Sequence, residues 1–173
     1  RDQLQLLSVQ DPLTGARNRR AMNDELKIAS ATQRRHGDQY AVLVMDLDSF
    51  KQINDTYGHQ AGDQVLKDFV ELIKAYSRKE DRLFRFGGEE FLLLLPNTDQ
   101  DSLQTVASHL QQQVALQLKG PGGTVTMSSG GAILQRGEHW EAMLQRADQR
   151  LYLAKSAGRN RAIVADPEAL AQE

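Results

Sequence analysis

Two adjacent carboxylates at the tip of an expected hairpin are the residues of this chain best suited to metal chemistry. Gly87 and Gly88 precede Glu89 and Glu90, and apolar segments flank the group within residues 83–95. Glycine suits such a turn because it can take positive φ and lets the backbone lie close against a ligand. Glycine and acid are also ordinary turn residues, so the hairpin alone favours a plain turn over a functional site.

A third carboxylate, Asp46, directly follows a separate apolar segment. Residues 40–45 are continuously apolar, which is typical of a central strand covered on both faces. We favour a metal-binding role for Asp46 because it is a charged residue at the end of an otherwise apolar strand. Asp48 points the same way only if the strand continues past Asp46, and Asp48 or Ser49 could instead cap the helix that follows.

The polar groups near the next two helix ends have structural explanations. Residues 50–59 are expected to form a short helix that ends at Gly58, and Gly62 with Asp63 to open a longer one. On spacing alone, a local turn bond by Asn54 and helix capping by Asp63 are favoured over ligand binding.

Two charged pairs lie outside these segments. Lys155 and Arg159 are four residues apart at the end of the last long helix, where the helix dipole favours cations. Arg78 and Asp81 are three residues apart in a charged connector. From spacing alone, the second pair is a solvated surface pair of little energetic weight.

The order of apolar segments predicts the fold. It runs strand, two helices, hairpin, helix, strand, helix and short strand. This order fits an α+β, ferredoxin-like βαββαβ core, in which helices surround a mainly antiparallel sheet and a hairpin is added. The remaining elements are expected as helices over 18–33, 103–114 and 140–154, a loop at 119–123, a bulge or close backbone approach at 130–131, and a last strand at 163–164.

This topology brings the candidate carboxylates together. The end of the first strand lies beside the tip of the hairpin that pairs near it, so Asp46 is expected to face Glu89 and Glu90. Three carboxylates from two distant segments make a better metal site than either segment alone. Hard oxygen ligands favour Mg²⁺ or Mn²⁺ over zinc.

Length and composition limit the classes of protein. At 173 residues with 40% hydrophobic content, the chain suits one domain with a full core. A net charge of −2 lacks the basic footprint of a protein that binds nucleic-acid polymers, so any nucleotide is expected to be a small ligand. Cysteine is absent, which removes disulfides and thiolate metal sites. No apolar run is long enough to span a bilayer, and we expect a soluble, cytoplasmic domain without membrane contact.

Turn signals divide the chain into three parts. We expect residues 1–10 to be the end of an N-terminal helical linker, residues 11–165 to be the main domain and residues 166–173 to be a C-terminal tail. The DPLTG turn at 11–15 marks the first boundary. Because the chain begins at Arg1 rather than Met, we also expect a preceding sensory or regulatory part, in a larger protein that could be anchored in a membrane.

Four ordered motifs resemble the GGDEF domains, the diguanylate cyclases of bacterial signalling. They are DPLTGARNRR at 11–20, DLDSFKQINDTYGHQAGD at 46–63, RFGGEEF at 85–91 and ADQRLYLAKSAGRNR at 147–161. The third motif carries the signature as its GGEEF variant, and Ala16 stands where the family usually has Leu. The resemblance covers Asp11 to about Arg161 and implies condensation of two GTP into cyclic di-GMP across a homodimer.

The resemblance also implies roles for individual residues. Mg²⁺ or Mn²⁺, two ions per site, would be held by Asp46, the Leu47 backbone carbonyl and Glu89, with Glu90 as a further ligand. Glu89 and Glu90 are then the catalytic candidates, with Glu89 as the proton acceptor. The remaining substrate contacts would be Asn54 and Asp63 on guanine, and Lys51, Lys155 and Arg159 on phosphates.

The same resemblance changes the interpretation of Arg78 and Asp81. They stand at the spacing before the GGEEF segment where the family has its RxxD inhibitory site, which binds the product cyclic di-GMP. His109 and Gln111 lie where an assisting Arg is common, so we expect weaker inhibition than usual. Two alternatives remain: a non-catalytic receptor for GTP or cyclic di-GMP, and a cyclase that makes a monomeric cyclic nucleotide, which the GGEEF segment disfavours.

Overall fold

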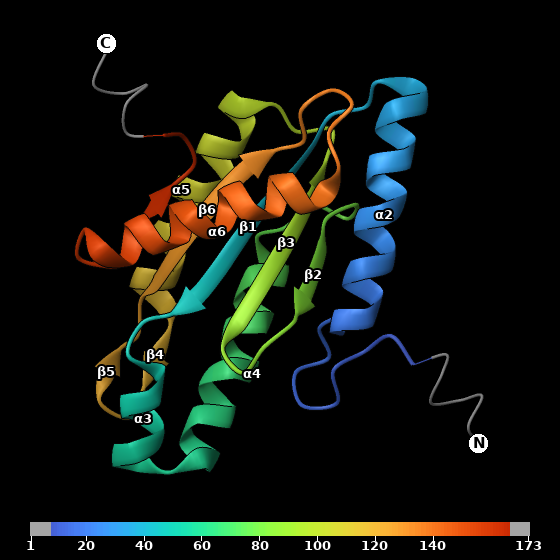
Figure 1. Cartoon of the computed structure of the whole chain (residues 1–173). Helices are drawn as coiled ribbons and strands as arrows, with labels where there is room; N and C mark the ends of the chain where they lie inside the picture. Colours follow the sequence, from blue (N-terminus) through green and yellow to red (C-terminus); the bar gives the residue numbers. More distant parts are fainter. Residues whose placement is uncertain (1–7, 167–173) are drawn as a thin grey trace.

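A five-stranded sheet forms the centre of the molecule (Figure 1). The structure is a computed structural model, and it describes residues 8–166. The strand order is β2-β3-β1-β6-β7, and every neighbouring pair is antiparallel except β6 with β7. The strands are β1 (Tyr40–Leu47), β2 (Arg82–Arg85), β3 (Glu90–Pro96), β6 (Met127–Ile133) and β7 (Ala162–Ile163). The expected α+β fold with a mainly antiparallel sheet is confirmed.

Helices cover both faces of the sheet (Figure 1). Alternate residues of β1 point to opposite faces, so Leu43 packs in the core beneath α4 and α5, whereas Val44 packs beneath α2 and α6. This explains why β1 is apolar throughout its length. The helices that cover the two faces are α2 (Arg19–His36), α4 (His59–Ala75), α5 (Gln100–Gln117) and α6 (Trp140–Ser156).

Local signals define the ends of α2, but the start of α4 differs from the prediction. The Asn18 side chain accepts a hydrogen bond from the Ala21 backbone N–H at 3.0 Å, and α2 ends at Gly37, which has φ of 73°. The short helix α3 (Phe50–Tyr57) ends as predicted at Gly58. However, α4 begins directly at His59. Capping by Asp63 was therefore the wrong interpretation.

Two smaller elements also differ from the prediction. The expected loop at 119–123 takes part in a two-stranded ribbon of β4 (Lys119–Gly120) and β5 (Gly123–Thr124). Of the expected helical linker, residues 1–7 lie outside the described part, and residues 8–10 are not helical, because Gln10 pairs with Arg17 in an isolated bridge. Most of the expected tail, residues 167–173, also lies outside it.

The two glycines of β6 mark a close backbone approach, which was one of the two alternatives considered. A Cβ atom on Gly130 would lie 2.2 Å from both the Ala147 carbonyl oxygen and the Leu151 backbone nitrogen of α6. Only a residue without a side chain lets this helix lie so close to the sheet. Among the described helices, none is long and apolar enough to cross a lipid bilayer.

Candidate active site

A polar cavity of about 190 Å³ opens where β1 ends beside the hairpin of β2 and β3. The antiparallel register places Asp46 opposite Glu90, as the predicted topology requires. Lys155 at the end of α6 and Arg159 in the turn after it supply two cations. The cavity is lined by Asp46, Leu47, Asp48, Ser49, Phe50, Lys51, Glu89, Lys155 and Arg159.

Asp46 is a buried carboxylate with one oxygen free to accept a ligand. Its side chain is 8% exposed, and its Oδ2 atom forms an ion pair with the Lys155 ammonium group. Its Oδ1 atom is buried and has no hydrogen-bond partner among residues 8–166. A buried, unpaired carboxylate oxygen is costly unless a cation or donor reaches it. Asp46 is therefore suited to a second positive group beside Lys155.

Glu89 lies close enough to Asp46 for the two carboxylates to influence each other. Burial raises the pKa of Glu89, the neighbouring charge of Asp46 raises it further, and the Lys155 ammonium group opposes the shift. Two carboxylates held together in a partly buried site repel each other unless positive charge is supplied. The pair is therefore electrostatically suited to a bound divalent cation.

Glu90 does not join this pair. It is exposed, and its Oε1 atom would lie 2.1 Å from a Cβ on Gly87, so its side chain folds back over the glycine. Among residues 8–166, no three His, Cys, Asp or Glu side chains are grouped closely enough to hold a metal ion. The expected convergence of three carboxylates is therefore not observed. Neither Gly87 nor Gly88 has the positive φ that was expected of this turn. What favours glycine at position 87 is the close approach of the Glu90 side chain.

The donor set fits a hard divalent cation. Asp46 and Glu89 offer carboxylate oxygens, and Leu47, whose carbonyl is the expected backbone ligand, belongs to the same cavity lining. Oxygen donors of this kind are those that Mg²⁺ and Mn²⁺ prefer. Asp48, which the sequence suggested as a helix cap, makes no cap bond; its carboxylate instead accepts hydrogen bonds from β6 and from the turn after α6. Ser49 occupies the N-cap position of α3, and its backbone carbonyl oxygen accepts from the Ile53 N–H at 3.2 Å, but its side chain makes no cap bond. The expected side-chain cap is therefore wrong for both residues.

Asn54 and Asp63 lie on adjoining parts of α3 and α4. The Asn54 Oδ1 atom is buried without a hydrogen-bond partner in the described part of the chain, and a Cβ on Gly62 would lie 1.8 Å from it. The expected local turn bond is made by the Asn54 backbone carbonyl, which accepts from the Gly58 N–H at 2.8 Å, and not by the side chain. The amide of Asn54 is thus free to accept from a ligand that enters between α3 and α4.

Arg85 connects the hairpin to the N-terminal turn, a link that our sequence interpretation missed. Its guanidinium donates to the Gly88 carbonyl oxygen at 2.7 Å and to the Gly87 carbonyl oxygen at 3.2 Å. Its Nη1 atom donates to both carboxylate oxygens of Asp11 at 3.1 and 3.3 Å. The available signals were an Arg directly before the glycine region and an Asp that opens a turn, but no spacing rule joins residues so far apart.

Comparison with known proteins identifies the family of this fold and site. The family model described as "Diguanylate cyclase, GGDEF domain" matches residues 8–161. The chain belongs to the GGDEF family. This GGDEF domain is 41% identical over 158 residues to diguanylate cyclase DgcP of Pseudomonas aeruginosa, covering 90% of this chain and 24% of that protein. It spans between about a quarter and two fifths of the length of the curated relatives it matches.

Solved structures of GGDEF domains share the fold. The coiled coil and GGDEF domain of DgcB from Caulobacter crescentus, in complex with c-di-GMP, aligns with a TM-score of 0.87 at 34% identity, covering 95% of this chain and 89% of that one. The active GGEEF domain of a diguanylate cyclase from Vibrio cholerae aligns with a TM-score of 0.81 at 31% identity, covering 86% of this chain and 97% of that one.

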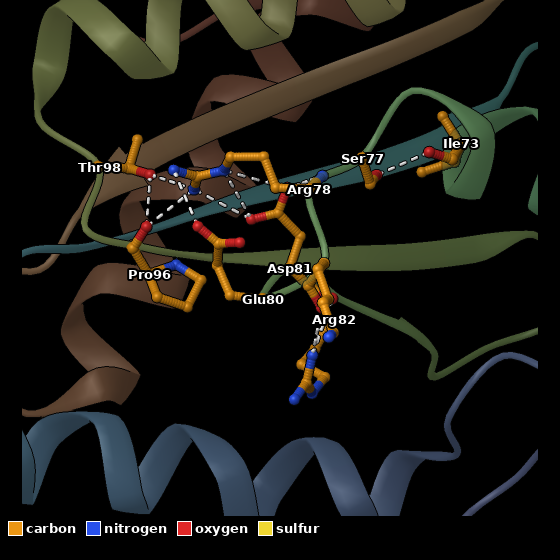
Figure 2. A network of polar contacts seen from close by, with 9 residues as sticks. Ile73, Ser77, Arg78, Glu80, Asp81, Arg82, Pro96 and Thr98 are labelled. Carbon is orange, nitrogen blue, oxygen red and sulfur yellow. Dashed lines mark hydrogen bonds and ion pairs between the residues drawn. The ribbon is translucent and has the colours of Figure 1, made fainter.

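In this GGDEF domain, Arg78 and Asp81 form a structured contact on the connector between α4 and β2. Figure 2 shows the Arg78 guanidinium between Asp81, the Pro96 carbonyl oxygen and Thr98, with Nη2 distances of 3.0, 2.8 and 2.9 Å. The Asp81 side chain is only 3% exposed and also accepts from the Arg78 backbone N–H at 2.8 Å. The interpretation of a solvated pair was therefore wrong for Asp81, although Arg78 is 41% exposed.

Replacing Asp11 with asparagine is expected to reduce stability at neutral pH and to leave it unchanged in strong acid. Burial raises the pKa of Asp11, but hydrogen bonds from Thr14 and from Arg85 outweigh it, and the net pKa lies below its ordinary value of 3.8. A carboxyl with a lowered folded-state pKa contributes stability above its unfolded pKa and loses it as pH falls through the folded value.

Urea denaturation from pH 7 down to pH 2 measures this difference. The wild-type midpoint should exceed that of Asp11→Asn at pH 7, and the two should converge below about pH 4. Asp24→Asn, at an exposed position of α2, is the matched control. A constant difference between wild type and Asp11→Asn at every pH would contradict the assignment.

Proposed function

We propose that this domain is a diguanylate cyclase that condenses two GTP into cyclic di-GMP and two pyrophosphates. The observation that carries the proposal is the cavity in which the Asp46 and Glu89 carboxylates face the Lys155 and Arg159 cations. A carboxylate pair for metal, beside cations for a polyphosphate, is the combination that nucleotidyl transfer requires. Its similarity to named diguanylate cyclases supports the same activity.

The proposed substrate contacts divide between the base, at Asn54 and Asp63 outside the cavity lining, and the phosphates, at residues of the lining. The Asn54 oxygen without a partner accepts from the guanine donors, and Asp63 accepts from the same edge. Lys51, Lys155 and Arg159 bind the phosphate oxygens, because ammonium and guanidinium groups form short charge-assisted hydrogen bonds with them. These contacts orient the ribose and the α-phosphate before reaction.

Members of this family are generally metal-dependent, and we propose two Mg²⁺ or Mn²⁺ ions per site. Asp46, the Leu47 carbonyl and Glu89 would hold them, and Glu90 would become a further ligand only after turning away from Gly87. When bound, such ions lower the pKa of a hydroxyl and neutralise negative charge on phosphate. The orphaned Asp46 oxygen and the Glu89 pair support this assignment.

The reaction joins two nucleotides that lie on separate subunits of a homodimer. The ribose 3′-oxygen of one GTP forms a bond to the α-phosphorus of the other, the bond from that phosphorus to the bridging oxygen breaks, and pyrophosphate leaves. Glu89 accepts the hydroxyl proton. A second, symmetric step closes the ring. The protein contributes mainly position and charge, as is usual for phosphoryl transfer.

Product formation is expected to rise faster than linearly with protein concentration. The reason is that each subunit carries one GTP, so activity follows the dimer population until the dimer is saturated. Chromatographic analysis of products from GTP and Mg²⁺, after removal of bound nucleotide, measures this directly over a wide range of protein concentration.

Three outcomes separate the candidate functions. Cyclic di-GMP with a steeper than linear dependence supports a dimeric cyclase. If the product is a monomeric cyclic nucleotide, the domain is a nucleotidyl cyclase of another kind and not a diguanylate cyclase. No product at any concentration, from a demonstrated dimer that binds GTP, would favour a non-catalytic receptor.

We further propose that cyclic di-GMP binds at Arg78 and Asp81 and inhibits the enzyme. Arg78 is partly exposed, and a guanidinium can fork onto a phosphate or stack on guanine. Of the two residues that stand where an assisting Arg is common, Gln111 is bonded to the Met127 carbonyl oxygen at 2.9 Å, and His109 packs edge-on against Tyr76. Neither supplies a second guanidinium, which supports weaker inhibition than is usual in the family.

Arg78→Ala is expected to weaken cyclic di-GMP binding by about tenfold or more, because a charge-assisted contact is lost. Calorimetric titration with cyclic di-GMP checks this. Arg78→Lys keeps the charge without the fork and should recover only part of the affinity. Equal product affinity for wild type and Arg78→Ala would rule out this site. Thermal melts of both variants control for loss of the contacts to Pro96 and Thr98.

The proposal places the domain in the cytoplasm, where GTP is available. We also propose a sensory or regulatory part N-terminal to it, since the curated relatives are much longer than this chain.

A further inference from the structure

Asp48 is a nearly buried carboxylate, 9% exposed, whose oxygens are already filled by protein donors. Its Oδ2 atom accepts from the Thr126 hydroxyl at 2.6 Å and from the Asn160 backbone N–H at 3.0 Å. Its Oδ1 atom accepts from the Ser128 hydroxyl at 2.6 Å. Asp46, two residues away, has an oxygen with no partner. Asp48 is therefore suited to a structural role, whereas Asp46 is suited to binding a ligand.

The bond to Asn160 reaches a turn in an unfavourable conformation. Gly158, Arg159 and Asn160 follow one another with φ of 121°, 65° and 48°. Residues with side chains rarely adopt left-handed φ, and such conformations persist only where the surroundings hold them. Arg159 lines the candidate active site. Whatever holds this turn also sets the place from which the Arg159 side chain reaches the cavity.

Backbone bonds hold the first part of this turn to the end of α6: the Arg159 N–H donates to the Ala154 carbonyl oxygen at 3.0 Å, and the Gly158 N–H donates to the Lys155 carbonyl oxygen at 3.3 Å. The Asn160 side chain accepts from Gln111 Nε2 at 2.8 Å, and the Arg159 carbonyl oxygen accepts from Arg161 Nε at 3.0 Å, but both bonds are exposed to solvent. A hydrogen bond to a carboxylate with little access to water is stronger than a bond that is exposed to water. Asp48 therefore anchors the Asn160 end of the turn, beyond the backbone bonds to α6.

The same residue also fixes the loop that follows β1. The Asp48 backbone N–H donates to the Thr126 carbonyl oxygen at 2.9 Å, and Ser49 after it has φ of 58°. Asp48 thus joins the segment that carries Asp46 and the Leu47 carbonyl to the turn that carries Arg159. The candidate metal side and the candidate phosphate side of the cavity meet at this carboxylate.

We propose that Asp48 is a positioning residue that holds Arg159 in place for the triphosphate of GTP. This inference rests on the proposed function, because that function assigns Arg159 to phosphate. Asp48 itself touches neither nucleotide nor metal. Its effect on the nucleotide therefore passes through Arg159 and disappears when Arg159 is absent.

A double-mutant cycle on nucleotide affinity tests this dependence. The probe is 3′-deoxy-GTP with Mg²⁺, which lacks the reacting hydroxyl, and binding is measured by calorimetry. Asp48→Asn and Arg159→Ala should each weaken binding by about tenfold. The double variant should bind no more weakly than Arg159→Ala alone, since coupled residues are not additive. If the loss of affinity in the double variant equalled the product of the two single losses, the residues would act independently and the proposal would be overturned.

Asp99→Asn is the matched control for general loosening of the structure. The Asp99 side chain accepts from the Ser102 N–H at 2.8 Å at the start of α5, away from the turn. This variant loses a structural carboxylate bond and should keep the wild-type affinity. If it weakened binding as much as Asp48→Asn does, the specific role of Asp48 would be refuted.

Hydrogen exchange of the Asn160 backbone amide tests the anchor without any nucleotide. The residue is exposed, yet its N–H should exchange slowly in wild type because Asp48 accepts it. Asp48→Asn should speed that exchange by about tenfold. Rapid exchange in wild type would overturn the inference even if Asp48→Asn did not fold. Failure of wild type to bind 3′-deoxy-GTP, with a protected Asn160 amide, would instead count against the proposed function.

Discussion

Replacing Glu89 with glutamine is expected to lower the rate of cyclic di-GMP formation by at least about 100-fold. The substitution keeps the size of the side chain. It removes the negative charge beside Asp46, which is proposed to bind metal, and the carboxylate proposed to accept the proton. Guanine and phosphate contacts come from other residues, so binding of 3′-deoxy-GTP should remain measurable. Initial rates at saturating GTP, at a protein concentration where wild type is dimeric, provide the measurement.

Glu90→Gln is the matched control for this experiment. The two carboxylates are adjacent, but Glu90 is exposed and folds back over Gly87. Its loss should therefore reduce the rate less than the loss of Glu89. If both variants lost activity equally, Glu90 would have to turn into the site during reaction. Full activity of Glu89→Gln would remove Glu89 from the catalytic group altogether.

Replacing Gly130 with alanine is expected to lower the free energy of unfolding by about 3 kcal/mol or more. The added Cβ would lie 2.2 Å from backbone atoms of Ala147 and Leu151, and backbone atoms cannot turn aside as a side chain can. The helix α6 would have to move away from β6, and Lys155 and Arg159 lie at its end. For a domain of this size the midpoint of thermal unfolding should fall by about 6–12 °C.

Gly88→Ala is the matched control for stability. No atom of the described residues lies within 4 Å of a Cβ at this position, and its φ is not positive. Its unfolding free energy should stay within about 0.5 kcal/mol of wild type. A Gly130→Ala variant as stable as Gly88→Ala would mean that α6 does not lie against β6 as described.

The sequence predicted the fold and the central pair of the site because both follow from topology. Once residues 40–45 form a central strand and 83–95 a hairpin, the antiparallel register brings Asp46 to the hairpin tip. The close approach at Gly130 was anticipated for a similar reason, since paired glycines in a strand have few other uses.

Side-chain direction and the ends of elements could not be predicted in the same way. Glu90 has several rotamers at an exposed position, and no sequence rule selects the one that folds over Gly87. Asp48 resembles a helix cap because the strand before it ends one residue earlier, and its actual partners lie 78 to 112 residues further along the chain. Gly62 suggested a helix start, whereas its role is to leave room for Asn54.

The ion pair between Asp46 and Lys155 joins residues 109 positions apart, and this has a consequence for folding. Contacts so distant in sequence form late, because the entropy of closing a long loop must be overcome first. During synthesis, Asp46 and Glu89 emerge long before the cation that partners Asp46. A nascent or truncated chain that lacks α6 is then left with an acidic, uncompensated strand end. The candidate active site should therefore be complete only after the last helix has docked on the sheet.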